Sequence, residues 1–171
     1  MKKFLAFFMA LIMAFSFAGC SESKDEHPLI GRTSEQEDGF YEGRIGDTFR
    51  TAFFEFTVKS AMVVDAYADY KAEEGMKLID IVISEKNIFD DSLPMFNYDY
   101  QMQWGSEGFA NGLLDLDEKV MPKEFTLGID EEVEYHLVYE VPIDVSDFQL
   151  VYLEVYEDNS EGDFFAVYFE V

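Results

Sequence analysis

The sequence predicts an all-β protein, an immunoglobulin-like antiparallel β-sandwich of about seven strands. Apolar and polar residues alternate with period two through most of residues 47–171, and turn-forming clusters of Gly, Asp, Asn and Ser separate these stretches. Of the 171 residues, 49% are hydrophobic and 17% aromatic, so the chain can build a core despite a net charge of −24. Because it has a single cysteine, no intramolecular disulfide can form and apolar packing must stabilise the fold.

Residues 1–19 have the features of a lipoprotein signal peptide. Two lysines precede an apolar run over residues 4–17, which is shorter than the roughly twenty residues that a spanning helix needs. The following Phe17-Ala18-Gly19-Cys20 resembles the bacterial lipobox, in which the cysteine is diacylated and becomes the mature N-terminus, although leucine is usual at the position of Phe17. Lipidation of Cys20 would anchor the protein in the cell membrane, on its extracytoplasmic face.

An ordinary secretory cleavage is the alternative for this leader. Ser16-Phe17-Ala18 also satisfies the small-x-small rule, and a cut there would leave Cys20 as a free thiol. We favour the lipoprotein interpretation because the lone cysteine of the chain falls at the one position that a lipobox requires.

Residues 20–46 are expected to form a flexible acidic linker. They are rich in Ser, Glu, Asp and Gly, contain Pro28, and show no sustained apolar period. Phe40 and Tyr41 are the exceptions, since both could pack onto the domain that follows. The domain itself is assigned to residues 47–171.

Alternation defines the strands of this domain. The predicted strands cover residues 47–51, 54–64, 76–85, 96–104, 124–128, 133–141, 148–156 and 163–171. Within 96–104, the alternation places Tyr98, Tyr100 and Trp104 on the core face. Residues 105–122 depart from the pattern, since glycines precede a leucine-rich acidic stretch, and this loop is expected to hold a short helical turn.

The composition argues against nucleic-acid binding and against catalysis. A chain with 36 acidic and 12 basic residues repels phosphate backbones. Nucleophilic catalysis usually needs a histidine base, but His27 lies in the linker and His136 lies on the polar face of its strand. No Gly-x-Ser-x-Gly motif is present, and His and Cys are too few for a zinc site, so we expect a protein without enzymatic activity.

Two sets of residues are candidates for ligand contact. Tyr67, Tyr70 and Phe109 are aromatic residues predicted to lie in loops, where they could stack on a sugar or contact a partner. Asp158, Ser160 and Asp163 resemble part of a calcium loop but lack its downstream glutamate, and a hairpin turn explains the same residues without an ion. A weak Ca²⁺ site is therefore the one cofactor to consider.

Dispersed strand patterns over residues 46–171 resemble an uncharacterised family of bacterial lipoprotein domains, found mostly in Gram-positive bacteria. The matching stretches include Phe54-Glu-Phe-Thr-Val58, Tyr70-Lys-Ala-Glu-Glu-Gly75 and Leu137-Val-Tyr-Glu-Val-Pro142. The resemblance implies an immunoglobulin-like fold, similar to that of the immunoprotective extracellular proteins, behind a lipoprotein signal and a polar linker. The family has no assigned activity, so the resemblance implies no site residue.

Two functional hypotheses follow from these observations. The first is a membrane-anchored module without enzymatic activity, which presents its domain to an envelope or protein partner. The second is a surface module that binds a small ligand, a carbohydrate or Ca²⁺. The first predicts an exposed apolar and aromatic patch near the loops of the sandwich, surrounded by acidic residues. The second predicts a pocket or convergent carboxylates.

Overall fold

The computed structural model describes residues 39–156 and 159–171 of the chain. The predicted signal peptide (residues 1–19), the lipidation site Cys20, His27 and most of the linker lie outside the described residues. No helix in the described part is long and apolar enough to cross a membrane. The structure therefore concerns the domain that follows the predicted anchor.

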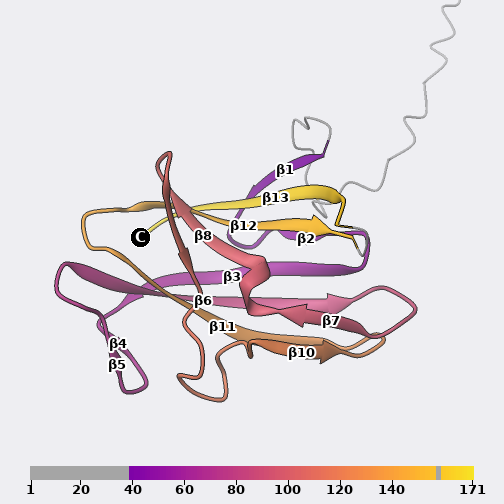
Figure 1. The fold of residues 1–171 in the computed structure, drawn as a ribbon, viewed down its shortest axis with the longest axis horizontal. Helices are drawn as coiled ribbons and strands as arrows, with labels where there is room; N and C mark the ends of the chain where they lie inside the picture. The colour runs from indigo at the N-terminus through magenta and orange to yellow at the C-terminus, as the bar shows by residue number, and fades with distance from the viewer. Residues whose placement is uncertain (1–38, 157–158) are drawn as a thin grey trace, which may run out of the picture.

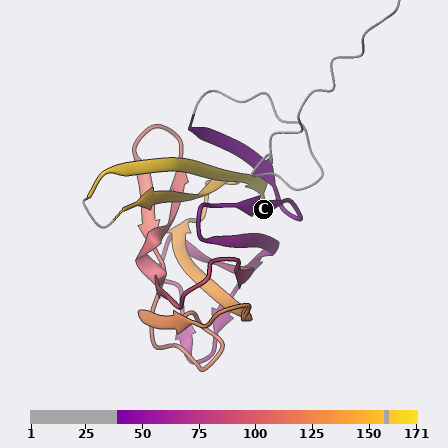
Figure 2. The same cartoon turned by 90° about the vertical axis from the view of Figure 1, so that its right-hand side faces the viewer.

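The described residues form two main β-sheets that pack face to face (Figures 1 and 2). One sheet has the order β1 (Phe40–Arg44), β13 (Glu161–Glu170), β12 (Asp147–Val155), β8 (Tyr100–Trp104) and β9 (Gly108–Asn111). The other has the order β11 (Glu132–Pro142), β6 (Met76–Asn87), β3 (Phe54–Val64) and β2 (Thr48–Arg50). Two small two-stranded sheets complete the fold: β4 (Ala66–Tyr67) with β5 (Tyr70–Lys71), and β7 (Leu93–Phe96) with β10 (Glu124–Leu127). The prediction of an all-β sandwich is confirmed.

Phe40–Arg44 belongs to the domain as strand β1, although the sequence placed these residues in the linker. Strand β1 pairs in parallel with β13, so the five-stranded sheet is not purely antiparallel. The rings of Phe40 and Phe164 stack at 5.1 Å, and those of Tyr41 and Phe165 do the same. Burial of two aromatic rings stabilises this strand although the sequence around it is polar.

The core between the sheets is strongly aromatic. Phe56 of β3 lies at its centre, with its ring 5.0–6.1 Å from five others, those of Phe49, Phe54, Tyr100, Tyr152 and Phe165. Most of these contacts are tilted or edge-to-face, the arrangements that the charge distribution of aromatic rings favours. Aliphatic side chains of β6 and β11 fill the other half of the core.

A 3₁₀ turn, η1 (Asn97–Asp99), interrupts the alternation that the sequence shows between Phe96 and Trp104. Tyr100 is buried as predicted and Trp104 packs half-buried against the core, but Tyr98 is 54% exposed while Asn97 is buried. Within the turn, side chains do not alternate between the core face and the solvent face as they do in a strand. A residue that the alternation assigns to the core can therefore point to solvent. The prediction that Tyr98 lies in the core is therefore wrong.

Residues 105–122 contain no helical turn. Strand β9 occupies the first part of this segment, and later residues form isolated bridges to the free edge of β11 at Val138 and His136. The acidic residues that suggested a helix instead make turns: Asp117 Oδ1 accepts hydrogen bonds from the backbone N–H groups of Lys119 and Val120. Local side-chain bonds of this kind compete with helix formation.

Candidate functional site

A cleft of about 1030 Å³ lies at one end of the sandwich. In Figure 1 it is the right-hand end, where the β2–β3 turn, the β6–β7 connection and the β12–β13 turn meet. Seven aromatic side chains line the cleft: Phe53, Phe54, Phe89, Phe96, Tyr98, Tyr152 and Tyr156. Loops at the ends of a sandwich are common recognition surfaces, so this cleft is the leading candidate for a binding site.

Exposed apolar side chains gather at the same end. Of the eleven large apolar side chains that are exposed among the described residues, five line the cleft or adjoin it: Ile88, Phe89, Tyr98, Val155 and Tyr156. Single exposed apolar residues are normal on a protein surface, but a contiguous group often marks an interaction site. This group corresponds to the aromatic patch that the first hypothesis predicts.

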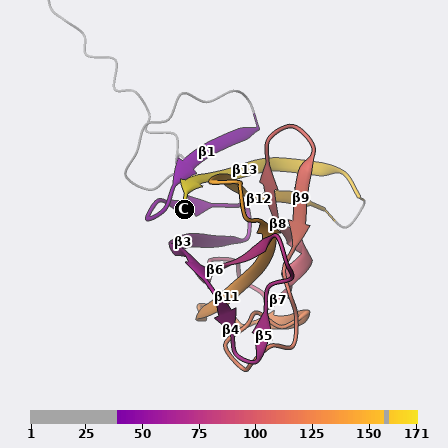
Figure 3. The ribbon, with the colours of Figure 1, turned by 90° about the vertical axis from the view of Figure 1, so that its left-hand side faces the viewer.

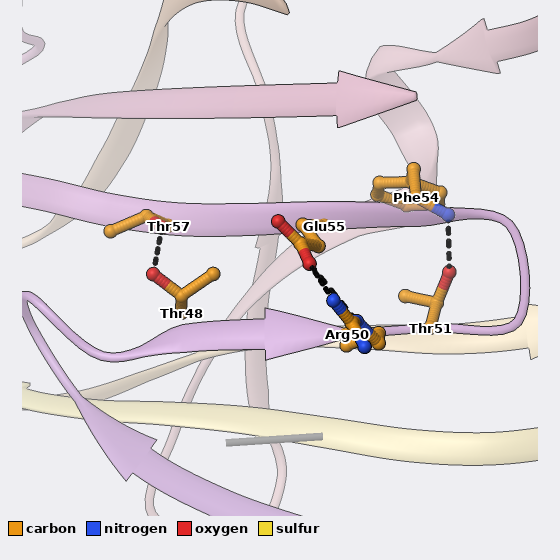
Figure 4. Close-up of polar contacts among 6 residues, drawn as sticks. All are labelled: Thr48, Arg50, Thr51, Phe54, Glu55 and Thr57. Carbon is orange, nitrogen blue, oxygen red and sulfur yellow. Dashed lines mark hydrogen bonds and ion pairs between the residues drawn. The ribbon is translucent and has the colours of Figure 1, made fainter. Parts of the chain in front are cut away.

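The β2–β3 turn forms one wall of the cleft and is held by side-chain hydrogen bonds (Figure 4). The Thr51 hydroxyl accepts bonds from the backbone N–H groups of Phe53 and Phe54, at 3.1 and 3.0 Å. On the outer face of the hairpin, Thr48 and Thr57 share a hydrogen bond of 2.7 Å. These contacts fix the direction in which Phe53 and Phe54 enter the cleft.

Glu154 holds the turn and the β12–β13 hairpin together. Its carboxylate is buried and accepts bonds from the backbone N–H of Ala52 at 2.8 Å, the backbone N–H of Asp163 at 3.2 Å and the phenol of Tyr156 at 3.3 Å. Several donors to one buried carboxylate fix its position and offset part of the cost of burying it. The walls of the cleft are thus preorganised by one residue at their junction.

Acidic groups with raised pKa values lie at and beneath the cleft. Burial raises the pKa of Asp99, which lines the cleft, to about 6. Burial also raises the pKa of Glu85 to about 7, although the hydrogen bond from Tyr100 opposes this shift. No Lys or Arg is found among the residues that line the cleft. The site therefore combines aromatic faces with carboxyl groups and no internal cation.

Tyr67 and Tyr70, predicted to lie in loops, form the short β4–β5 hairpin instead, at the lower end of the molecule in Figure 3. The Tyr67 phenol donates a long hydrogen bond of 3.4 Å to Asp117, and the Tyr70 phenol donates one of 3.1 Å to Glu140. Burial and the neighbouring Asp117 raise the pKa of Tyr67 to about 12. Both phenols are thus engaged within the chain.

Phe109 lies on strand β9 and is 60% exposed. Its ring packs against neither candidate tyrosine, and Figure 3 shows β9 well above the β4–β5 hairpin. The structure therefore does not bring the three predicted contact residues into one site. None of them lines the cleft, because the sequence gives no indication of which turns meet in space.

The candidate calcium residues are only partly described. Asp158 lies outside the described residues, while Ser160 is exposed and Asp163 begins to enter strand β13. The backbone N–H of Asp163 donates a hydrogen bond to the side-chain carboxylate of Glu154. Among residues 39–156 and 159–171, no group of three or more His, Cys, Asp or Glu side chains is arranged to hold a metal ion.

His136 is less exposed than the sequence suggested and belongs to a small polar cluster on the outer face of the four-stranded sheet. Its Nδ1 lies 2.7 Å from Oδ1 of the buried Asp80, and its ring lies 5.6 Å from that of Tyr67. Within the described part of the chain, no Ser, Thr or Cys side chain is hydrogen-bonded to His136. The pair therefore lacks the nucleophile that a catalytic triad needs.

Comparison with solved structures shows a similar fold in two proteins of Bacillus subtilis. The YjhA protein of Bacillus subtilis matches with a TM-score of 0.56 and 17% identity, over 76% of this chain and 99% of that one. YcdA, a candidate lipoprotein of Bacillus subtilis, matches with a TM-score of 0.54 and 18% identity, over 80% of this chain and 39% of that one. An uncharacterised β-sandwich protein of Clostridium difficile matches with a TM-score of 0.49 and 14% identity, over 80% of this chain and 99% of that one.

Comparisons at the level of sequence give no relative. No protein-family model matches the chain, and no curated protein is significantly similar to it. At identities of 17% and 18%, the two Bacillus subtilis matches support the fold and show nothing about activity. Moreover, the chain spans only 39% of the length of YcdA.

Proposed function

We propose that this chain is a membrane-anchored extracytoplasmic lipoprotein, related to the uncharacterised lipoprotein domains that it resembles, and that it acts as a binding module without enzymatic activity. Its Ig-like domain would present the aromatic cleft to a protein partner in the cell envelope. The observation that carries the proposal is the coincidence of a cleft of about 1030 Å³ with five exposed apolar side chains. A surface of this kind is costly to leave in water unless something covers it.

Two further observations support the non-enzymatic part of the proposal. The histidine of the described domain is bonded to Asp80, and neither residue lines the cleft. The carboxylate of Glu154 is saturated with donors that hold the walls, which is a structural role. The anchoring part rests on the lipobox-like sequence at Cys20 and on a structural neighbour that is itself a candidate lipoprotein.

Site-specific photocrosslinking in the native cells tests the binding role. A photoreactive phenylalanine analogue replaces Tyr98 or Phe89 at the cleft, and Phe109 serves as the control because it is at least as exposed and does not line the cleft. We expect one discrete adduct from both cleft positions and none from Phe109. Adducts of equal intensity from all three positions, or none from the cleft positions, would refute the role of the cleft.

The anchor is tested separately. Metabolic labelling with an alkyne-tagged fatty acid should mark the wild-type protein, and Cys20→Ser should abolish the label and release the domain into the medium. Ser21→Ala is the control for a change beside the cleavage site. Release of unlabelled wild-type protein would instead support ordinary secretion, leaving Cys20 as a free thiol.

A further inference from the structure

We propose that the cleft, taken as the binding site of the proposed function, receives a Lys or Arg side chain carried by an apolar segment of the partner polypeptide. The proposal deepens the proposed function by naming the chemistry of the partner, and it rests on that function. Four features of the cleft support it: an unpaired carboxylate, the arrangement of the rings, the charge of the lining and the size of the cleft.

Asp99 is the group that would meet the cation. It belongs to the turn η1, lines the cleft and is half-buried, yet its carboxylate makes no hydrogen bond or ion pair within the described residues. The charge of Asp99 also acts on a second carboxyl group, that of Glu85. Glu85 is 1% exposed, and its Oε2 is buried with no hydrogen-bond partner. Desolvated carboxyl groups without a partner are destabilising, and an incoming cation would remove part of that cost.

The aromatic residues of the lining offer the faces that a cationic side chain prefers. The ring of Phe53 meets those of Phe89 and Tyr156 edge to face, at 5.3 and 6.1 Å, which makes a three-ring wall. Phe96 and Tyr98 stack at 5.0 Å beside Asp99. Ammonium and guanidinium groups are attracted to aromatic faces within about 6 Å, more strongly where water is excluded.

Nothing in the lining competes with an external cation. The cleft contains the acidic side chains Asp91, Asp99 and Glu154 and no Lys or Arg. The net charge of −24 adds a long-range field that attracts basic partners and repels acidic ones. Charge complementarity thus favours a basic partner both at a distance and in contact.

The dimensions favour a polypeptide over a small organic cation. A cleft of about 1030 Å³ is at the upper limit of the roughly 300–1,000 Å³ that small-molecule sites occupy. Its apolar surface also continues beyond the cavity, since Ile88 is exposed next to Phe89 without lining it. A small amine would leave that surface in water, whereas apolar residues on either side of a lysine would cover it.

A peptide array with the purified domain tests the inference. The probes are otherwise identical nonapeptides with apolar flanks, and Lys, Arg, Gln or Glu occupies the central position. At an ionic strength of about 0.15 M, which screens long-range attraction, we expect the Lys and Arg peptides to bind roughly tenfold more tightly than the Gln peptides. The Glu peptides should not bind detectably.

Two variants with the same change of charge distinguish the site from the overall field. Asp99→Asn should reduce the preference for Lys over Gln to about twofold, because it removes the unpaired carboxylate. Asp144 lies in the β11–β12 turn, at the opposite end of the sandwich from the cleft. Asp144→Asn should therefore leave the preference for Lys over Gln unchanged. Equal effects of the two variants would overturn the inference in favour of non-specific attraction.

The remaining outcomes separate this inference from the proposed function. Equal binding of Lys and Gln peptides that is lost in Tyr98→Ser would overturn the cationic partner while supporting the cleft as a binding site. Displacement of the Lys peptides by choline at stoichiometric concentration would overturn the polypeptide in favour of a small organic cation. Failure of every peptide to bind, together with specific crosslinks from Tyr98 in cells, would overturn the inference alone.

Discussion

The phenol of Tyr100 donates a 2.7 Å hydrogen bond to Oε1 of Glu85 and thereby joins the two sheets through the core. Tyr100 belongs to β8 of the five-stranded sheet and Glu85 to β6 of the four-stranded sheet. One donor is not enough for a buried carboxylate, since Oε2 of Glu85 has no partner. The bond gives the core a polar element whose protonation depends on pH.

Stability should decrease as pH rises from about 4.5 to 7, because burial raises the pKa of Glu85 from its ordinary value of 4.5 to about 7 in the folded protein. Within this range the folded state retains a proton that the unfolded state has lost. At about 1.4 kcal/mol per pKa unit, the penalty at pH 8 is at most roughly 3.5 kcal/mol. Urea unfolding at pH 5 and pH 8 measures the difference.

Glu85→Gln should flatten this pH dependence and raise the free energy of unfolding at pH 8, since the amide is neutral at both pH values. Glu161→Gln is the matched control because Glu161 is exposed. A smaller slope should persist in Glu85→Gln, because burial also raises the pKa of Asp99. An unchanged slope in Glu85→Gln would mean that Glu85 is not the group responsible.

Glu154→Ala should destabilise the domain by roughly 3 kcal/mol, because it removes the acceptor for two backbone N–H groups and a phenol. Glu154→Gln retains one carbonyl oxygen and should cost less. Chemical denaturation measures both, and Glu170→Ala, an exposed site on the same sheet, should change stability by less than about 0.5 kcal/mol. Equal stability of Glu154→Ala and wild type would contradict the role of Glu154 as the junction of the walls.

Gly108→Ala should be destabilising by roughly 2 kcal/mol, since a Cβ at this position would lie 2.2 Å from Nε1 of Trp104 on the paired strand. The indole ring would have to move away from the hairpin. Because Trp104 is the single tryptophan of the chain, its fluorescence emission reports the movement directly. Asn111→Ala, on the same strand, should alter neither emission nor stability, and an unshifted emission in Gly108→Ala would refute the predicted clash.

Thr51→Val should cost about 1–2 kcal/mol, because the methyl group cannot accept the hydrogen bonds of the Phe53 and Phe54 N–H groups. Thr51→Ser keeps the hydroxyl and should stay close to the wild type. Thermal unfolding measures the difference between the variants. The same substitution loosens one wall of the cleft, so Thr51→Val should also weaken peptide binding, while a full effect in Thr51→Ser would point to packing instead of hydrogen bonding.

The long strands were predictable from the sequence because their environment is regular. In β11, the buried Leu137, Tyr139 and Val141 alternate with residues of the opposite face, and period two follows directly from the pleat. Strand β6 is buried on both faces, as its continuous apolar composition indicated. In such segments, the residues that the local pattern marks as apolar are the same residues that the packing of the sheets buries.

Strand β1 and the cleft were not predictable in this way. The partner of Phe40 is Phe164, at the other end of the domain, so no local pattern records their pairing. The cleft likewise forms where turns containing Phe53 and Tyr156 meet, more than 100 residues apart in the chain. The prediction for Tyr98 was wrong for a related reason: the short turn η1 interrupts the alternation of core-facing and solvent-facing side chains along this segment.

By itself, the sequence determined the class of fold and the strong negative charge, and it predicts an order of anchor, linker and domain, because each depends on composition or on the period of neighbouring residues. Only the tertiary structure decided which turns adjoin, and hence that aromatic rings and an unpaired Asp99 share one cleft. The physical reason is that strand pairing and sheet packing act between residues distant in the chain, where burial and hydrogen bonding are satisfied collectively.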